Sequence, residues 1–311
     1  MIVDVHGHVT HPELFERFPM PPALADIEGM LEQKAEAGIE LTIVGSPVGF
    51  GTMMRVPGLD NYAQPLDRLK SFHEWLAATV AAHPARLAAY AYTNPFGGPE
   101  LLEQTAETVR DGGFVGIIVN SSVQGRYLDL EEADEFFAMA DEVGVPIFLH
   151  PGAEPVGSDS VTDFRLVEQV SRFFDVAVSL ATLILAGRLA QYPQLRIVAA
   201  TAGGGVALVA NRIDSAQRAR PPAEGVTRAE LTRAPSEYLR EIYVDTANQS
   251  PAGQLANLEL LGPERMLFGT DSPPLATPLE RAIAMVKELP IEAEQQDRIL
   301  AGNARELFDL S

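Results

Sequence analysis

Two histidines stand one residue apart near the start of the chain, directly after an apolar run. Residues 2–5 are mostly β-branched and predict a buried strand, and His6 and His8 follow them. Side chains alternate along a strand, so we expect both imidazoles on one side, and Gly7 between them allows close approach of another segment. Neutral imidazole is a common ligand for Zn, Fe and similar ions. The pair therefore predicts part of a metal site, with capping or surface histidines as the alternative.

Short apolar segments alternate with helical segments along the chain. The expected strands lie at 2–5, 41–44, 86–92, 115–119, 146–149, 195–200, 242–245 and 265–268. Nearly continuous apolar strands that alternate with helices are typical of a parallel sheet covered on both faces. Eight of them in 311 residues predict a (β/α)8 barrel of the TIM type, as a single domain over 1–311. An open doubly wound sheet is the alternative, but no Gly-x-Gly-x-x-Gly follows a strand.

In such a barrel the chemistry takes place where the strands end. His150 directly follows the strand at 146–149, and Asp271 follows the strand at 265–268. A carboxylate at the rim of a buried barrel needs a partner, and a divalent cation held by three imidazoles and one carboxylate would supply it. A water molecule in an open coordination position would then be activated. We expect His73 and His83 to be ordinary surface residues.

Composition excludes several classes of protein. The chain has no cysteine, so disulfides and thiolate ligands are absent, and its net charge of −20 argues against a nucleic-acid or anionic membrane surface. We see no leader segment, and the most apolar stretch, 173–187, carries an Asp and is short for a membrane span. That stretch predicts a buried helix or a subunit interface. We therefore expect a cytoplasmic protein that forms a homodimer and acts on a small molecule.

Five motifs together resemble the amidohydrolase superfamily, and more narrowly the amidohydrolase-related (amidohydrolase 2) branch that contains aminocarboxymuconate-semialdehyde decarboxylase. They are Asp-Val-His-Gly-His at 4–8, His-Pro-Gly at 150–152, Ala-Gly-Gly-Gly at 202–205, Phe-Gly-Thr-Asp-Ser-Pro at 268–273 and Gly-Asn-Ala-Arg-Glu-Leu-Phe at 302–308. The resemblance implies a distorted barrel with one divalent metal, Zn first and Mn or Fe as alternatives. It places His6, His8, His150 and Asp271 on the ligand positions. The segment 117–120 lacks the bridging Lys of the dinuclear branches.

The sequence departs from this branch at one position. The branch carries a catalytic His after the sixth strand, and counting back from Arg212 that position is Thr201. A threonine hydroxyl is too weakly basic to act as a general base near neutral pH. Three explanations stay open. Asp271 transfers the proton alone, Glu154 or Asp159 replaces the histidine, or catalysis has been lost.

Other polar residues are candidates for supporting roles. Asp4 lies on the same side of its strand as His6, which favours a role as acceptor of a ring N–H over that of a residue at the bottom of the barrel. Asp245 at the end of the seventh strand is similar, with helix capping as the alternative. Arg55 and Arg126 lie in expected active-face loops, where either could bind a substrate carboxylate, with a surface charge as the alternative. Further candidates for substrate contacts are Asn120, Glu154 and Thr201.

The leading functional prediction is a metal-dependent hydrolase that uses a metal-bound water on an acyl bond (amide, ester, lactone or thioester) of a small organic acid. Asp271 would be its catalytic proton carrier. The first alternative is a metal-dependent, non-oxidative decarboxylase of an aromatic or muconate-like acid. The second alternative is a non-catalytic relative that binds a ligand.

Overall fold

Eight parallel strands form one sheet in the computed structural model of this chain. The model describes all residues except 57–58, 162–164, 218–229, 248–249, 275–277 and 311. The strands pair in the order β1-β2-β3-β4-β7-β8-β9-β10. Their bounds are β1 Val3–His8, β2 Leu41–Gly45, β3 Leu87–Tyr92, β4 Gly116–Asn120, β7 Ile147–His150, β8 Ile197–Ala199, β9 Tyr243–Asp245 and β10 Met266–Leu267. A short antiparallel pair, β5 Ser122–Val123 and β6 Arg126–Tyr127, follows β4.

The first and last strands meet, so the sheet closes into a barrel. The backbone N–H of Val5 in β1 donates to the carbonyl oxygen of Phe268, directly after β10, at 2.9 Å. Parallel strands expose no polar edge once the ring is closed, and their apolar side chains fill its interior. In that interior Tyr90 stacks on Phe148 with ring centroids 5.0 Å apart. The predicted (β/α)8 barrel is confirmed.

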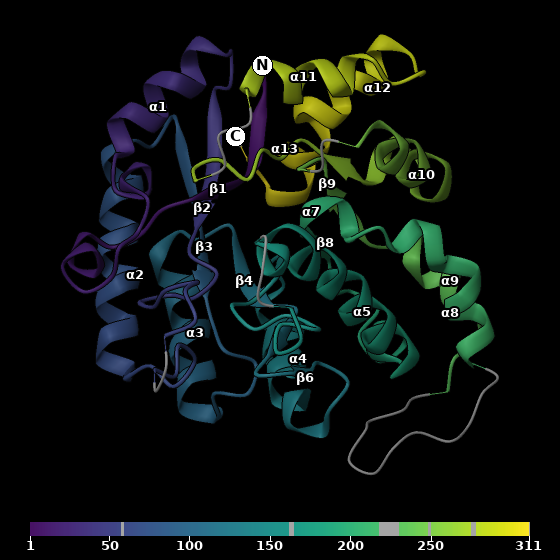
Figure 1. Cartoon of the computed structure of the whole chain (residues 1–311), viewed down its shortest axis with the longest axis horizontal. Coiled ribbons are helices and arrows are strands. Elements are labelled where there is room, and N and C mark those ends of the chain that lie inside the picture. The colour runs from purple at the N-terminus through teal and green to yellow at the C-terminus, as the bar shows by residue number, and fades with distance from the viewer. Residues whose placement is uncertain (57–58, 162–164, 218–229, 248–249, 275–277, 311) are drawn as a thin grey trace.

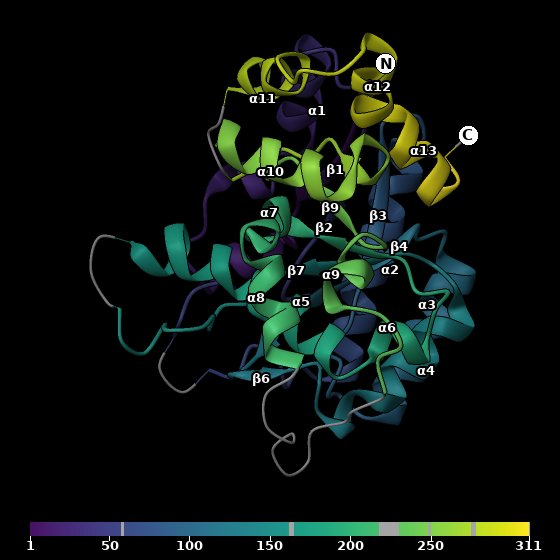
Figure 2. The ribbon, with the colours of Figure 1, turned by 90° about the vertical axis from the view of Figure 1, so that its right-hand side faces the viewer.

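Helices surround the strands in both views (Figures 1 and 2). Their bounds are α1 Ile27–Glu36, α2 Leu66–Ala82, α3 Pro99–Gly112, α4 Asp134–Val143, α5 Arg172–Leu185, α6 Arg188–Gln191, α7 Ala200–Gly203, α8 Ala210–Gln217, α9 Pro235–Leu239, α10 Pro251–Leu261, α11 Leu279–Lys287, α12 Ala293–Asp297 and α13 Asn303–Phe308. Within the described part of the chain, no helix has the length and apolarity to cross a membrane. That one domain spans 1–311 stays a prediction.

The long apolar stretch at 173–187 forms most of α5, the element expected as a buried helix or an interface. Val176, Leu180 and Leu183 are fully buried against the barrel, whereas Phe174 is 51% exposed. Burial in the core therefore accounts for most of its apolar character. The sequence also indicates one helical region over about 163–192, but the structure divides it, because Gly187 adopts φ +82° between α5 and α6. The sequence further indicates a surface excursion at 221–235, and most of that segment lies outside the described residues.

The expectation that His73 lies on the surface is wrong. Its side chain in α2 is only 3% exposed, and its Nε2 accepts the backbone N–H of Tyr92 at 3.0 Å. Burial lowers the pKa of His73 to about 4, which keeps the ring neutral. Neutral imidazole serves here as an acceptor that fastens α2 to β3.

We expect His73 to weaken the fold as the solution is acidified. Its pKa is about 4 in the folded chain and 6.5 when unfolded, so the unfolded chain binds the proton first and stability falls as pH drops from 6.5 to 4. The shift corresponds to about 3 kcal/mol of unfolding free energy. His73→Gln keeps an acceptor without titrating. Urea unfolding of both proteins across this range should show a shallower pH dependence in the variant, and equal slopes would contradict the assignment.

Candidate metal centre

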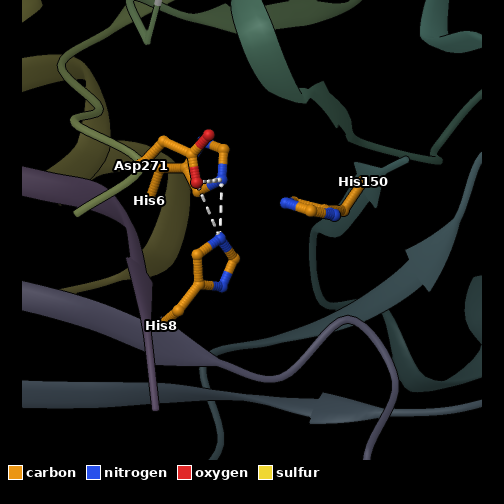
Figure 3. A group of neighbouring side chains, drawn as sticks. All are labelled: His6, His8, His150 and Asp271. Atoms are coloured by element: carbon orange, nitrogen blue, oxygen red, sulfur yellow. Dashed lines mark hydrogen bonds and ion pairs between the residues drawn. The ribbon is translucent and has the colours of Figure 1, made fainter. Parts of the chain in front are cut away.

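Four side chains from three strand ends converge at the carboxyl end of the barrel. His6 and His8 come from the end of β1, His150 is the last residue of β7, and Asp271 lies four residues after β10. Each offers one ligand atom, and these atoms all lie within 4.8 Å of one another. Figure 3 shows His150 pointing toward the other three from the opposite side. The structure thus brings together the four residues singled out in the sequence.

The hydrogen bonds of the rings fix which nitrogen of each histidine faces the centre. His8 Nδ1 lies 3.2 Å from the carbonyl oxygen of Gly45, and His150 Nδ1 lies 2.8 Å from that of Pro151. A carbonyl oxygen only accepts, so both Nδ1 atoms carry the hydrogen. His6 Nδ1 lies 2.5 Å from Asp245 Oδ2 and donates to it in the same way. All three Nε2 atoms therefore direct lone pairs toward the centre.

These lone pairs lie close together, and the distances between the donor atoms show whether a cation fits among them. The Nε2 atoms of His6 and His8 are 3.1 Å apart, and Asp271 Oδ1 lies 3.4 Å and 3.0 Å from them. Electron-rich atoms at such distances repel unless a proton or a cation lies among them. Three imidazole nitrogens and one carboxylate oxygen are a donor set that Zn²⁺, Mn²⁺ and Fe²⁺ accept. The arrangement fits one divalent metal ion.

The electrostatics of the site match this donor set. Burial acts to raise the pKa of Asp271, but the neighbouring His6 and His8 outweigh it and hold that pKa below its ordinary value. Burial acts to lower the pKa of His6, but the carboxylates of Asp271 and Asp245 raise it above its ordinary value. Burial holds the pKa of His150 well below its usual range, and the adjoining His8 and His6 add to this effect. Asp271 therefore stays ionised as a negative partner for a cation.

Asp245 holds the His6 ring in place. Its Oδ2 accepts from the ring, and its Oδ1 accepts the backbone N–H groups of Ala202 at 2.8 Å and Ala247 at 3.2 Å. The carboxylate thus connects the ring to the turn after β8 and fixes its tautomer, as partners of metal-binding histidines do. Phe148 packs edge-on against the same ring, with centroids 4.9 Å apart.

Asp4 supports the backbone and not the ring that was expected. Its Oδ1 accepts the backbone N–H groups of His6 and Thr270, each at 3.0 Å. Its Oδ2 accepts from the Thr270 hydroxyl at 2.6 Å and pairs with the ammonium group of Lys34. Both side chains of this ion pair are almost fully buried. Asp4 thereby joins the end of β1 to the segment that carries Asp271, which itself adopts φ +56°.

Thr201 occupies a strained turn directly after β8. Thr201 and Ala202 both adopt left-handed conformations, with φ of +52° and +54°, and such conformations are costly without glycine and cluster at functional sites. The Thr201 hydroxyl is buried and has no hydrogen-bond partner within the described chain. The Ala202 N–H that binds Asp245 belongs to the same turn. No imidazole is present at the position where the resemblance would place a base.

The predicted substrate-binding arginines lie in different surroundings. Arg55 donates to the Ser158 carbonyl oxygen at 2.8 Å and to Asp159 at 2.7 Å, so it connects two loops. Arg126 lies over the Phe96 ring, 4.4 Å from its centroid, and lines a cavity of about 340 Å³. None of the four clustered residues lines that cavity. Within the described residues, no contact directs the guanidinium group of either arginine toward the cluster of four.

Asn120 and Glu154 lie near His150. Asn120 ends β4, is paired in register with His150, and donates to the Pro47 carbonyl oxygen at 2.8 Å. Its Oδ1 is buried without a hydrogen-bond partner in the described structure. Glu154 is half-buried in the loop after His150. Their contacts with a substrate, like that of Thr201, stay predictions.

Sequence reasoning missed Lys34 and Tyr62. Lys34 lies in an amphipathic helix, where a lysine usually indicates a solvent-exposed face. Tyr62 lies in a long loop, and its hydroxyl accepts the Ala153 N–H at 3.0 Å, three residues after His150. Neither residue belongs to a local motif. Only the fold places them beside the site.

Comparison with known proteins finds relatives over most of the chain. A family model described as amidohydrolase matches residues 3–310. The 2-amino-3-carboxymuconate-6-semialdehyde decarboxylase of Dictyostelium discoideum is 24% identical over 269 residues, which cover 85% of this chain and 73% of that protein. The gamma-resorcylate decarboxylase of Polaromonas sp. JS666 is 28% identical over 252 residues, with 77% and 75% covered.

A solved structure has the same fold over nearly the whole chain. It is a dihydroxybenzoic acid decarboxylase from Polaromonas sp. JS666 with bound manganese and the inhibitor 2-nitroresorcinol. Its TM-score is 0.78 at 22% identity, and the match covers 99% of this chain and 97% of that one. The leading prediction of a hydrolase is wrong, because the curated relatives are decarboxylases. The same ligand set serves both reactions, so the motifs alone did not separate them.

Proposed function

The chain belongs to the amidohydrolase family, and from this premise we propose that it is a metal-dependent, non-oxidative decarboxylase of an aromatic or muconate-like acid. The observation that carries the proposal is the convergence of three Nε2 lone pairs and one carboxylate oxygen within 4.8 Å. The relatives are decarboxylases, and this supports decarboxylation over hydrolysis as the reaction of this centre.

Four residues would hold the metal: His6, His8, His150 and Asp271. When bound, the divalent ion supplies positive charge that stabilises negative charge on the substrate oxygens as CO2 leaves. Mn²⁺ is the candidate suggested by the related structure with bound manganese, and Zn²⁺ and Fe²⁺ fit the same donors. Metal analysis of the purified protein distinguishes these ions.

In this reaction the bond between the carboxylate carbon and the adjoining carbon breaks, and its electron pair stays on the adjoining carbon. That carbon must then take up a proton. Asp271 is ionised, and it is the member of the cluster that is partly exposed, at 17%, so its carboxylate can take up a proton from solvent and pass it to this carbon. We assign the delivery of this proton to Asp271. Asp245 holds the His6 ring in one orientation, and Nε2 of that ring lies 3.4 Å from Asp271 Oδ1.

Thr201 is compatible with this proposal because decarboxylation needs no activated water. A hydrolase requires a base to take a proton from water, and threonine cannot supply one near neutral pH. A decarboxylase requires delivery of a proton to carbon, and the Asp271 carboxylate can take one up from solvent and pass it on. The absence of an imidazole at this position is therefore a smaller obstacle to decarboxylation than to hydrolysis.

We extend the proposal to a small-molecule substrate and a homodimer. Exposed apolar side chains gather near the start of α5, namely Val156, Leu166, Val170 and Phe174. An apolar group of this kind is typical of a surface covered by another protein chain. Light scattering of the purified protein measures the oligomeric state directly.

The test of the proposed function is release of CO2. The metal-loaded protein, incubated with a panel of hydroxybenzoic and unsaturated dicarboxylic acids, should release one CO2 per molecule of acid consumed. Removal of the metal by a chelator should abolish the release, and one equivalent of Mn²⁺ or Zn²⁺ should restore it. Metal analysis should find about one ion per chain, since four protein ligands complete one site. Acid release from esters, amides or lactones without CO2, or two ions per chain, would contradict the proposal.

A further inference from the structure

The first turn of α5 lies among the loops that leave the barrel strands. Asp175 accepts the Ser122 hydroxyl hydrogen at 2.9 Å, just after β4, and the Val156 backbone N–H at 2.8 Å, in the loop after β7. A Cβ added to Gly204, after β8, would lie 2.3 Å from the Phe173 carbonyl oxygen. Glycine is therefore required for this close approach. The start of α5 is held over β4, β7 and β8.

Arg172, the first residue of α5, reaches toward the other side of the barrel mouth. Its Nη2 donates to the carbonyl oxygen of Met53 at 2.8 Å, in the segment that follows β2. α5 lies in the connection from β7 to β8, and in the ring of eight strands β2 is three places from β7 and four places from β8. This hydrogen bond therefore joins loops from opposite sides of the ring, at the end of the barrel where the candidate metal centre lies.

Not all hydrogen-bond donors of the Arg172 guanidinium group have a partner in the described part of the chain. Its Nε is buried and has no hydrogen-bond partner, and no carboxylate forms an ion pair with it, in the described part of the chain. Arg55, by contrast, is engaged by Asp159 and the Ser158 carbonyl oxygen. An unpaired N–H of a partly buried cation is costly, and an anion beside it would remove that cost.

The electrostatics place this cation close to the cluster without a direct contact. Burial lowers the pKa of Arg172, and the negative charges of Glu168 and Asp271 act in the opposite direction. Asp271 is thus near enough to act on the guanidinium group, yet the two side chains form no ion pair. A ligand held at Asp271 and its three histidines could place an anionic group against Arg172.

Tyr62 supplies a second donor in the same region. Its hydroxyl oxygen accepts the Ala153 N–H at 3.0 Å, which leaves its own hydrogen available. Burial raises the pKa of Tyr62 to about 12, so the phenol stays protonated near neutral pH. The positive charge of Arg172 acts on this phenol as well, so the two groups lie in one region. A cation and a hydroxyl donor together suit a carboxylate.

We propose that Arg172, with Tyr62 near it, binds a second anionic group of the substrate, one that remains on the product. The proposal rests on the proposed decarboxylase function and specifies its substrate class as acids with two anionic groups. The group must be the retained one, because the departing carboxylate becomes neutral CO2. A cation paired with the departing group would stabilise the bound substrate more than the transition state and slow the reaction.

The experiment compares two inert probes, benzene-1,3-dicarboxylate and benzoate, by calorimetric titration of the metal-loaded protein. We expect the wild type to bind the dicarboxylate about tenfold or more tightly, since a hydrogen-bonded charge contributes at least this much. Arg172→Gln should remove this preference and leave benzoate binding unchanged. Arg172→Lys should retain part of it, because the charge remains but the planar fork of donors is lost.

Arg55→Gln is the matched control, because it removes the same charge from a loop at the same end of the barrel. This variant should keep the preference for the dicarboxylate. If the wild type shows no preference, if neither probe binds, or if folded Arg172→Gln keeps the preference, the subsite does not exist. Circular dichroism shows whether Arg172→Gln folds. If it does not fold, the proposal is overturned when Arg172→Lys keeps the full preference for the dicarboxylate and Arg55→Gln loses that preference. CO2 release is measured separately, so a failed reaction with an intact preference refutes only the decarboxylase.

Discussion

Replacing Asp271 with asparagine should reduce decarboxylation by about a thousandfold or more, because an amide cannot deliver the proton and carries no charge. The exchange is nearly isosteric, so the fold should be unaffected. Three imidazole nitrogens remain, and weakened metal binding is expected to persist, as three-ligand sites hold metal in other proteins. The measurement is the rate of CO2 release at saturating metal, with the bound metal determined on the same sample.

Two variants show whether this loss is specific to Asp271. Thr201→Ala should cost about tenfold or less, because the Thr201 hydroxyl can contribute at most a hydrogen bond. His150→Ala should lose both metal and activity, since it removes the only ligand supplied from β7. If Thr201→Ala were as inactive as Asp271→Asn, the assignment of proton delivery to Asp271 would be wrong.

Replacing Lys34 with methionine should destabilise the protein by about 3–5 kcal/mol, the usual cost of removing one partner of a buried ion pair. Methionine fills a similar volume but leaves the Asp4 carboxylate buried without its cation. That carboxylate also accepts from the backbone of His6 and Thr270. Urea unfolding of the metal-free protein measures the loss without a contribution from bound metal.

The control for this prediction is Lys70→Met, which removes the same charge from an exposed position on α2. It should change stability by about 0.5 kcal/mol or less. The double variant Lys34→Met with Asp4→Asn should recover part of the loss, because no unpaired charge remains. A loss for Lys34→Met no larger than that for Lys70→Met would show that the ion pair contributes little.

The barrel was predictable because its strands are short apolar runs that end at glycine, proline or a polar residue. The expected strand at 41–44 is β2, Leu41–Gly45, and the expected strand at 146–149 is β7, Ile147–His150. The prediction failed where burial depends on distant neighbours. His73 is polar and helical, but its exposure is decided by the Tyr92 N–H in β3 and not by the residues around it in the sequence.

The cluster of four was predictable for a similar reason, since each member lies in the last residues of a strand or within four residues after one. What surrounds the cluster was not. Asp4 was expected to accept from an imidazole, and it instead pairs with Lys34, thirty residues away. Arg172 is one of several charges in a helical region, and only the closure of the ring brings it to the barrel mouth. The reaction itself was not encoded in the ligand set, because hydrolysis and decarboxylation use the same donors.

The ligands are distributed very unevenly along the chain, with His6 and His8 in β1 and Asp271 beyond β10. During synthesis on the ribosome, the first two ligands emerge long before the last. The nascent chain can offer its histidines but cannot complete the centre until β10 has paired with β1, because that pairing brings Asp271 to His8. A metal ion that binds only the folded state would then stabilise the closed barrel. Acquisition of metal should accordingly be a late event, after translation, and should favour chains whose two ends have met.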